Sequence, residues 1–278
     1  QDYVIHTGPF GLVEAVLGIM AFGGLLSALL GSAAVKAAAI VAVVIGVLGL
    51  YFLLVANKIE WRHKTDGERA VLRRQCDNLE SRGQKWRVLR WAHEIIVQAN
   101  GDVRETIEVS AVVECDVLDF VSVVAGPHWD WPDRLKPRVR LNVRSVQGRT
   151  RYDYTYDWIA RNRLKVLVHL TEPASRDDVV SFVVELQWPA KCAPLMRGHR
   201  QEDFVLIFDK PVEEVKYVVV LPPGFGVFHD RLGLTADDST LTSEPTRSGQ
   251  VETMLTVLDA PANKQFGMRL DLRSGAQP

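Results

Sequence analysis

The sequence predicts a protein of two parts: a membrane α-hairpin of two transmembrane helices, and an all-β domain that forms an antiparallel β-sandwich or barrel of about ten strands. Residues 10–57 are almost entirely apolar, which indicates the hairpin. From 93 to 273, apolar side chains recur at every second position in short segments between turn-forming residues, which is typical of β-strands. A basic connector at 58–92 joins the two parts, and short segments at 1–9 and 274–278 flank them.

The apolar segment divides into two runs of the length that a helix needs to cross a bilayer. Residues 10–30 contain one charged side chain, Glu14, and residues 33–56 contain one, Lys36. Each run has about 20 residues, which as a helix span a hydrocarbon core of about 30 Å. Neither run has the polar stripe of an amphipathic helix, and a short turn of small residues separates them. The sequence therefore favours a transmembrane hairpin over a buried soluble one.

Small residues recur at spacings of three and four in both runs, where they allow helices to approach closely. This pattern predicts packing within the hairpin, self-association into a homo-oligomer, or both. Glu14 is an intramembrane acid, which either pairs with the Tyr51 hydroxyl or extends to the headgroups. The predicted packing residues are Gly18, Gly24, Ala28, Ala38, Ala42, Gly46 and Gly49.

The charge distribution predicts the side of the membrane on which the β domain lies. Residues 1–35 contain no Lys or Arg, whereas ten basic side chains lie between Lys58 and Arg90. Because positive charge beside a span stays in the cytoplasm, we expect an inner-membrane protein, in contact with the lipid bilayer, whose β domain and termini are cytoplasmic. The three widely spaced cysteines agree, since disulfide frameworks use an even number.

The β domain follows a helical connector that we expect to end at the turn-forming residues 81–83. Asn100 and Gly101 mark a tight hairpin turn. Residues 221–250 are rich in Pro, Gly, Ser, Thr and Asp, and they predict a long loop that is either functional or mobile. The expected strands are 94–98, 103–115, 118–124, 139–146, 152–159, 164–170, 179–188, 204–208, 215–221, 251–258 and 266–272.

Arginines and aromatics gather between residues 138 and 158, a combination typical of platforms for nucleotides or single strands. Strand alternation favours another interpretation. We expect segments 139–146 and 152–159 to pair as a hairpin, with the aromatics on the core face and the arginines beside aspartates on the surface face. The aromatic residues are Tyr152, Tyr154, Tyr156 and Trp158.

Two loops are better candidates for a ligand site. Residues 126–134 place two tryptophans in a turn-rich segment, and residues 189–201 gather basic side chains. Aromatics and cations on loops of a β scaffold are typical of binding sites, and together they suit an anionic, planar small ligand such as a nucleotide. The alternative is that the tryptophans cap the core. The candidate ligand-binding residues are His128, Trp129, Trp131, Arg134, Lys191, Arg197, His199 and Arg200.

The sequence gives no support for catalysis. The histidines and cysteines lack the spacing of metal ligands, and neither a nucleophile elbow nor a phosphate-binding glycine loop is present. We therefore expect no enzyme, no catalytic residue, no cofactor and no metal. The formal net charge of -1 argues against a nucleic-acid polymer as partner.

In architecture, the apolar pair at 10–56 and the all-β remainder resemble the two-transmembrane, β-rich effectors of bacterial cyclic-nucleotide antiviral signalling. The resemblance carries no residue-level motif. It implies a cytoplasmic β domain that senses a cyclic nucleotide and spans that assemble to damage the membrane. We therefore expect a membrane-anchored sensor or effector that binds a ligand or partner and oligomerises through its hairpin. The alternative is a passive anchor or scaffold whose sandwich binds a protein partner.

Overall fold

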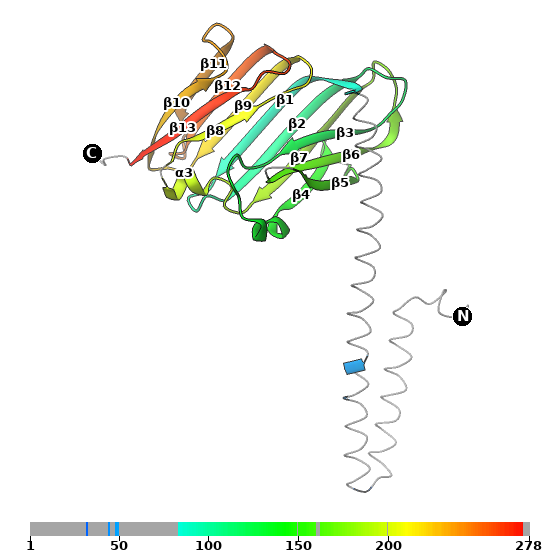
Figure 1. Cartoon of the computed structure of the whole chain (residues 1–278), viewed down its shortest axis with the longest axis horizontal. Coiled ribbons are helices and arrows are strands. Elements are labelled where there is room, and N and C mark those ends of the chain that lie inside the picture. The colour runs from blue at the N-terminus through cyan, green and yellow to red at the C-terminus, as the bar shows by residue number, and fades with distance from the viewer. Residues whose placement is uncertain are drawn as a thin grey trace. The chain divides into compact units, whose positions relative to one another are not determined.

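The computed structural model describes residues 83–148, 150–159, 162–198 and 200–274, together with Ser32, Val44, Leu48 and Gly49. The chain divides into two compact units, Gln1–Leu72 and Arg73–Pro278. The strands with assigned bounds, β1 to β13, all lie in the second unit, which we call the β domain (Figure 1).

Seven strands form the main sheet, in the order β11-β12-β9-β1-β2-β7-β4 (Figure 1). The central pair, β1 and β9, is parallel, whereas the other neighbouring pairs are antiparallel. A parallel pair requires a crossover connection, and here strands β2 to β8 lie between the two in sequence. The bounds are β1 (Trp86–Val97), β2 (Val103–Val113), β4 (Arg140–Ser145), β7 (Val179–Trp188), β9 (Val212–Leu221), β11 (Ser239–Pro245) and β12 (Val251–Ala260).

Two smaller antiparallel sheets complete the β domain, in the orders β10-β13-β8 and β3-β6-β5. Two short helices, η1 and α3, lie in the connections before β4 and β8. The bounds are β3 (Leu118–Ala125), η1 (Asp133–Arg138), β5 (Tyr154–Ile159), β6 (Arg163–Ala174), α3 (Ala193–Gly198), β8 (Glu202–Leu206), β10 (Phe225–Leu232) and β13 (Phe266–Ser274).

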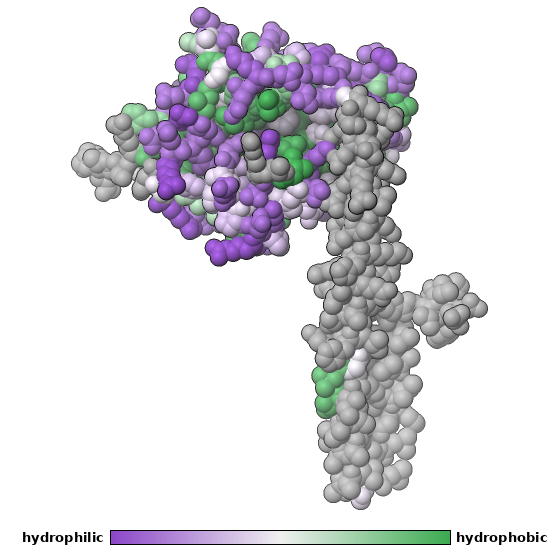
Figure 2. Space-filling model, in the orientation of Figure 1, coloured by the Kyte–Doolittle hydropathy of each residue, from purple (hydrophilic) through white to green (hydrophobic). Residues whose placement is uncertain are grey.

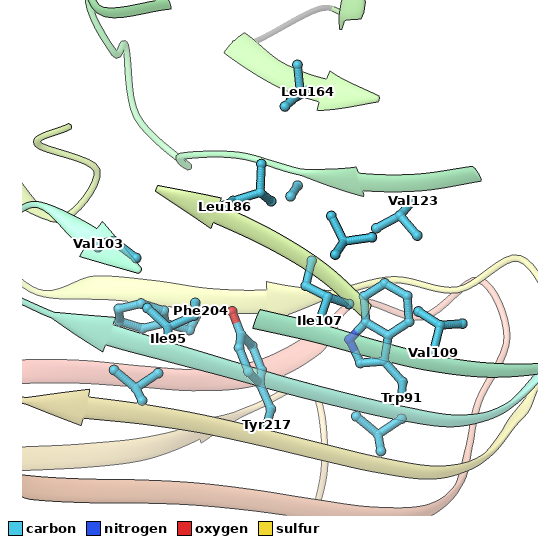
Figure 3. Close-up of a cluster of buried hydrophobic side chains, with 14 of the residues drawn as sticks. Trp91, Ile95, Val103, Ile107, Val109, Val123, Leu164, Leu186, Phe204 and Tyr217 are labelled. Carbon is cyan, nitrogen blue, oxygen red and sulfur yellow. The ribbon is translucent and has the colours of Figure 1, made fainter. Parts of the chain in front are cut away.

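One hydrophobic cluster joins both small sheets to the main sheet. It includes Ile107 and Leu186 from the main sheet, Val123 from β3 and Phe204 from β8, which Figure 3 draws together. Every second residue of β2 is buried, because alternate side chains of a strand point to opposite faces. The face of the β domain shown in Figure 2 is mainly hydrophilic. The main sheet and the small sheets therefore pack as a sandwich with one core.

The all-β prediction fits this architecture, but the predicted membrane α-hairpin is wrong. Among the residues that the structure describes, no helix is long and apolar enough to cross a membrane. A span needs about 20 helical residues, whereas η1 and α3 have 6 residues each. The predicted inner-membrane location depended on this hairpin, so that prediction is not supported either.

Most of the residues behind the hairpin prediction lie outside the described part of the chain, including Glu14 and every predicted packing residue except Gly49. Val44, Leu48 and Gly49 are helical and exposed. A Cβ atom added at Gly49 would meet no described atom within 4 Å. Self-association through the small residues therefore stays a prediction.

The segment 221–250, predicted as a loop, contains two strands, β10 and β11. Each lies at the edge of its sheet. The residues of β10 alternate only between half-buried and exposed, so this strand needs few apolar side chains. Because strands are recognised from sequence mainly by apolar alternation, an edge strand with so little burial gives a weak signal.

The predicted hairpin of 139–146 with 152–159 forms only beside its turn, where Arg144 and Arg151 make an antiparallel bridge, Ser145 N donates to the Thr150 carbonyl and Tyr152 N donates to the Val143 carbonyl. Beyond this point the segments separate, because β4 pairs with β7 in the main sheet and β5 pairs with β6 in a small sheet. Tyr152, Tyr154 and Trp158 pack against the core as predicted. In the middle of β5, however, Thr155 is 5% exposed and Tyr156 is 43% exposed, which is the reverse of the prediction. The face that a strand buries depends on its partner sheet, which local alternation does not identify.

Candidate functional site

A cavity of about 280 Å³ lies between the main sheet and the two small sheets. Residues of β1, together with Glu105 from β2 and Tyr217 from β9, line it from the main sheet, and β3 and β8 line it from the small sheets. Figure 3 shows three further lining side chains, Trp91, Val123 and Phe204, each from a different strand. The cavity therefore lies where all three sheets of the β domain meet.

Three ionisable side chains form a buried hydrogen-bonded chain at this cavity. The His93 Nε2 atom lies 2.7 Å from Glu105 Oε1, and Lys191 Nζ donates to Glu105 Oε2 at 2.6 Å. The exposed fractions of these residues are 5%, 0% and 4% for His93, Glu105 and Lys191. The His93 ring also stacks on Tyr217, with ring centroids 4.6 Å apart. A buried ion pair contributes little net stability compared with apolar side chains of the same volume, so stability alone does not account for this cluster.

The protonation states follow from the surroundings. Burial by itself would raise the pKa of Glu105, but the Lys191 charge and the His93 hydrogen bond lower it to about 2. Burial lowers the pKa of His93 below its usual value, despite the hydrogen bond to Glu105. At neutral pH, His93 is therefore a neutral ring that donates from Nε2 to Glu105, which makes Nδ1 an acceptor. Nδ1 is buried and has no hydrogen-bond partner among the described residues.

A second buried acid lines the same cavity. Glu202 is 8% exposed, and burial raises its pKa to about 7, an effect that the Lys191 charge and a hydrogen bond with Cys192 only partly offset. Its Oε2 atom is buried without a hydrogen-bond partner within the described part of the chain. Burial likewise raises the pKa of the Cys192 thiol well above its usual value. Glu202 thus changes charge near neutral pH, and in its ionised form the unpaired Oε2 atom can accept a hydrogen bond from a ligand.

One end of the cavity carries a cation without an anion. A Cβ atom at Gly126, just after β3, would lie 2.9 Å from the Arg163 Cα atom, so the close approach of β3 and β6 requires glycine there. Arg163 is partly buried, and its side chain forms no hydrogen bond or ion pair with another described residue. Burial lowers its pKa, but a guanidinium keeps its charge in proteins. His128 is exposed at the same end.

Among the residues that the structure describes, no group of three or more His, Cys, Asp or Glu side chains could hold a metal ion.

The two loops predicted as a ligand site meet in the structure. Trp129 Nε1 donates to the Lys191 carbonyl at 2.7 Å, and Trp131 Nε1 donates to the Pro189 carbonyl at 3.0 Å. Trp131 is 1% exposed and belongs to the core, where it stacks on Trp158. Trp129 is half-buried and packs against the core from outside.

Of the other predicted ligand-binding residues, His128 and Lys191 line the cavity. Arg134, Arg197 and Arg200 are exposed and are not among its lining residues. His199 lies outside the described residues. The prediction for the two loops thus includes two cavity residues and one core residue, and their role in binding stays a prediction.

Sequence reasoning missed His93, Glu105, Arg163 and Glu202. The sequence pattern could have identified Glu105, because this acid occupies an apolar position in the alternating strand 103–115, where Val103 and Ile107 share its face. The other three lie at or before the expected starts of strands, where alternation does not assign a face. Only the packing of the sheets places them at one cavity.

No family model matches this sequence, and no curated protein matches it. Solved structures give weak likenesses. A structure from Parabacteroides distasonis ATCC 8503, provisionally described as a protease, has a TM-score of 0.46 at 11% identity over 66% of this chain and 40% of that one. An M1 zinc metallopeptidase from Deinococcus radiodurans has a TM-score of 0.40 at 10% identity over 68% of this chain and 43% of that one.

The chain thus spans about two fifths of the length of the solved structures that it matches. Likenesses at this level carry no argument about what the chain does. The predictions that it is not an enzyme and that it resembles antiviral effectors stay predictions.

Proposed function

We propose that the β domain is a recognition module, without chemistry of its own, that binds a small ligand carrying an anionic group in the cavity between its sheets. One observation supports this function: His93 Nδ1 and Glu202 Oε2 are buried atoms without a partner among the described residues, and both line one cavity together with the half-buried, unpaired Arg163 side chain. Buried polar groups are nearly always hydrogen-bonded. Two such buried atoms beside an unpaired guanidinium at a single cavity therefore favour a ligand that supplies the missing bonds.

The lining predicts the chemistry of the ligand. Arg163 is suited to a carboxylate or phosphate, which its planar guanidinium can hold with two hydrogen bonds. His93 Nδ1 accepts a hydrogen bond, and the Glu202 carboxyl accepts one when ionised and donates one when protonated, so the ligand needs at least one donor. Trp91 and Phe204 form an apolar aromatic part of the lining, which suits a flat or apolar body. The planar, anionic ligand expected from the loops has this chemistry.

The test is calorimetric titration of the full chain with a set of aromatic and aliphatic monocarboxylates, each paired with its neutral amide. We expect some carboxylates to bind and their amides to bind at least tenfold more weakly. The variant Arg163→Gln should abolish this preference. Arg104→Gln is the matched control, because Arg104 is an exposed arginine on β2 that does not line this cavity.

Two results would contradict the proposal. One is equal binding of carboxylates and amides by the wild-type protein. The other is an acid preference that survives Arg163→Gln but is lost in Arg104→Gln, because the anion would then bind on the outer face of the main sheet.

A further inference from the structure

The cavity is bordered on two sides by strands that have a free edge. β3 is hydrogen-bonded to β6, and β8 is hydrogen-bonded to β13. Each lies at the end of its three-stranded sheet, and neither pairs with a second strand among the described residues. Both line the same cavity. An edge strand presents a row of main-chain N–H and C=O groups that can pair with another chain.

The lining residues indicate that these main-chain edges face the cavity. Successive side chains of a strand point to opposite faces, so a strand that borders a cavity with one face contributes every second residue. Here the lining includes the unbroken runs 122–126 from β3 and 204–208 from β8 and its continuation. Unbroken runs are expected when the strand is approached along its edge.

The two edges run in opposite directions across the cavity. Gly126 and Arg163 lie together where β3 ends, and Glu202, at the start of β8, interacts electrostatically with Lys191. Both pairs lie at the same end, because His128 interacts electrostatically with Arg163 and with Lys191. At the other end, Lys210, shortly after β8, donates to the carbonyl of Gln84, just before β1. An extended chain between the edges can therefore pair antiparallel with one strand and parallel with the other. It would join the two small sheets into one continuous sheet over the main sheet.

We infer that the ligand of this cavity is an extended peptide segment of another protein, which adds a strand between β3 and β8 and places its terminal carboxylate at Arg163. This inference rests on the proposed function, since it assigns the anionic group to a chain terminus. Main-chain pairing supplies affinity with little dependence on sequence. Four residues of β3 and Gly126, directly after it, line the cavity as one run, which sets the length of the segment at about five residues.

The probe is a library of acetylated pentapeptides with free carboxyl termini, titrated against the full chain. We expect binders whose C-terminal amides bind at least tenfold more weakly, and Arg163→Gln should remove this difference while Arg104→Gln keeps it. Single N-methylation of the best binder tests the pairing, because each methyl group removes one main-chain donor. A strand between two edges donates to both sides, so N-methylation at every interior position should weaken binding about tenfold or more.

Amide hydrogen exchange provides a second measurement on the protein itself. Binding of the best peptide should slow exchange in both 122–126 and 204–206, while the edge strand β11 on the main sheet remains unchanged. N-methyl sensitivity at alternate positions, or protection of one strand alone, would mean pairing with a single edge and would overturn the inference. Binding of carboxylates without binding of any pentapeptide would overturn it while the proposed function stands. If neither the carboxylates nor the pentapeptides bind, both the inference and the proposed function are wrong.

Discussion

Two buried carboxylates at the cavity, Glu105 and Glu202, have opposite surroundings. The pKa of Glu105 is lowered to about 2 and that of Glu202 is raised to about 7, from an ordinary value of 4.5. The lowered pKa contributes stability above pH 4.5, which is lost as the pH falls towards 2. The raised pKa contributes stability below pH 4.5, which is lost as the pH rises through 7. The two acids therefore favour the folded state most near pH 4.5.

We expect Glu202→Gln to stabilise the full chain at pH 8 relative to the wild type, because glutamine removes the cost of a buried charge. The difference should grow between pH 4.5 and 7 by about 1.4 kcal/mol per pH unit and then level off. Urea unfolding followed by tryptophan fluorescence at several pH values measures it.

The matched control for this pH dependence is Glu185→Gln. Hydrogen bonds from Asn142 and Arg144 lower the pKa of Glu185, so the effect of this substitution should change below pH 4.5 and stay constant between 5 and 8. A Glu202→Gln effect that is independent of pH would mean that Glu202 keeps one charge state throughout.

Lys191→Met tests the buried ion pair. Methionine has a similar volume but leaves the Glu105 carboxylate with His93 alone, and breaking a buried pair by removing one partner costs about 3 to 5 kcal/mol. Adding Glu105→Gln should recover a large part of this loss, because the uncompensated charge is gone. Free energies of unfolding of the two single variants and the double variant at pH 7 give the coupling, and simple additivity of the two losses would contradict the pairing.

At the scale of elements, the position of β8 depends on its close approach to β13 at one glycine, Gly267. It is a short strand, Glu202–Leu206, and β13 is its one partner within the described sheets. A Cβ atom at Gly267 on β13 would lie 1.9 Å from the Phe204 carbonyl oxygen and 2.8 Å from the Val205 Cα atom. Since both are main-chain atoms, a larger residue at Gly267 must push β8 away from β13. The wall of the cavity therefore depends on this glycine.

Gly267→Ala should destabilise the β domain by about 1 to 3 kcal/mol, the usual cost of overpacking a closely packed site. It should also raise the exchange rate of the β8 amides more than that of the β2 amides. Gly198→Ala is the control, because its added Cβ would meet only the Arg200 side chain at ordinary contact distance, 3.6 Å. Equal exchange in β8 for wild type and Gly267→Ala would show that the strand tolerates the methyl group.

The elements differ in how well the sequence predicts them. Strands such as β2 and β7, in the middle of the main sheet, bury apolar residues along one face and were predicted close to their observed bounds. The edge strands β10 and β11 bury little and were missed. For Trp131 the sequence leaves a binding loop and the core as alternatives, and the structure places it in the core. Sequence alone does not decide between them, because it does not show that Trp158 and Trp188 lie around Trp131. Local pattern predicts strands, whereas contacts between distant loops determine which tryptophans are buried.

For the whole molecule, the site depends on pairings between segments far apart in sequence. His93 on β1, Glu105 on β2 and Tyr217 on β9 lie on neighbouring strands because β1 pairs with β2 on one side and in parallel with β9 on the other. The first pairing follows from a hairpin turn that the sequence reveals. The second has no local signal, since parallel partners can be any two strands joined by a crossover. The sequence therefore does not predict the polar cluster as a whole, although it does single out Glu105 as a polar residue at a buried strand position.

The distribution of the core leads to a prediction for the molecule as a whole. Among the residues that the structure describes, the buried members of the hydrophobic cluster lie between Val88 and Leu272, and the compact unit that contains them begins at Arg73. A domain with its own core can fold alone. We therefore expect a fragment of residues 83–274 to fold cooperatively, with a midpoint of thermal unfolding within about 5 °C of the β-domain transition in the full chain.

Circular dichroism and two-dimensional NMR of the fragment test this prediction. Dispersed amide signals and a single thermal transition are the expected result. As a matched control, a fragment of residues 103–274 lacks β1, which lies between β2 and β9 in the centre of the main sheet, and it should fail to fold. A fragment 83–274 that is unfolded, or that melts far below the full chain, would mean that residues before 83 contribute essential contacts to the β domain. Folding of the fragment without β1 would mean that the centre of the main sheet is not what holds the sandwich together.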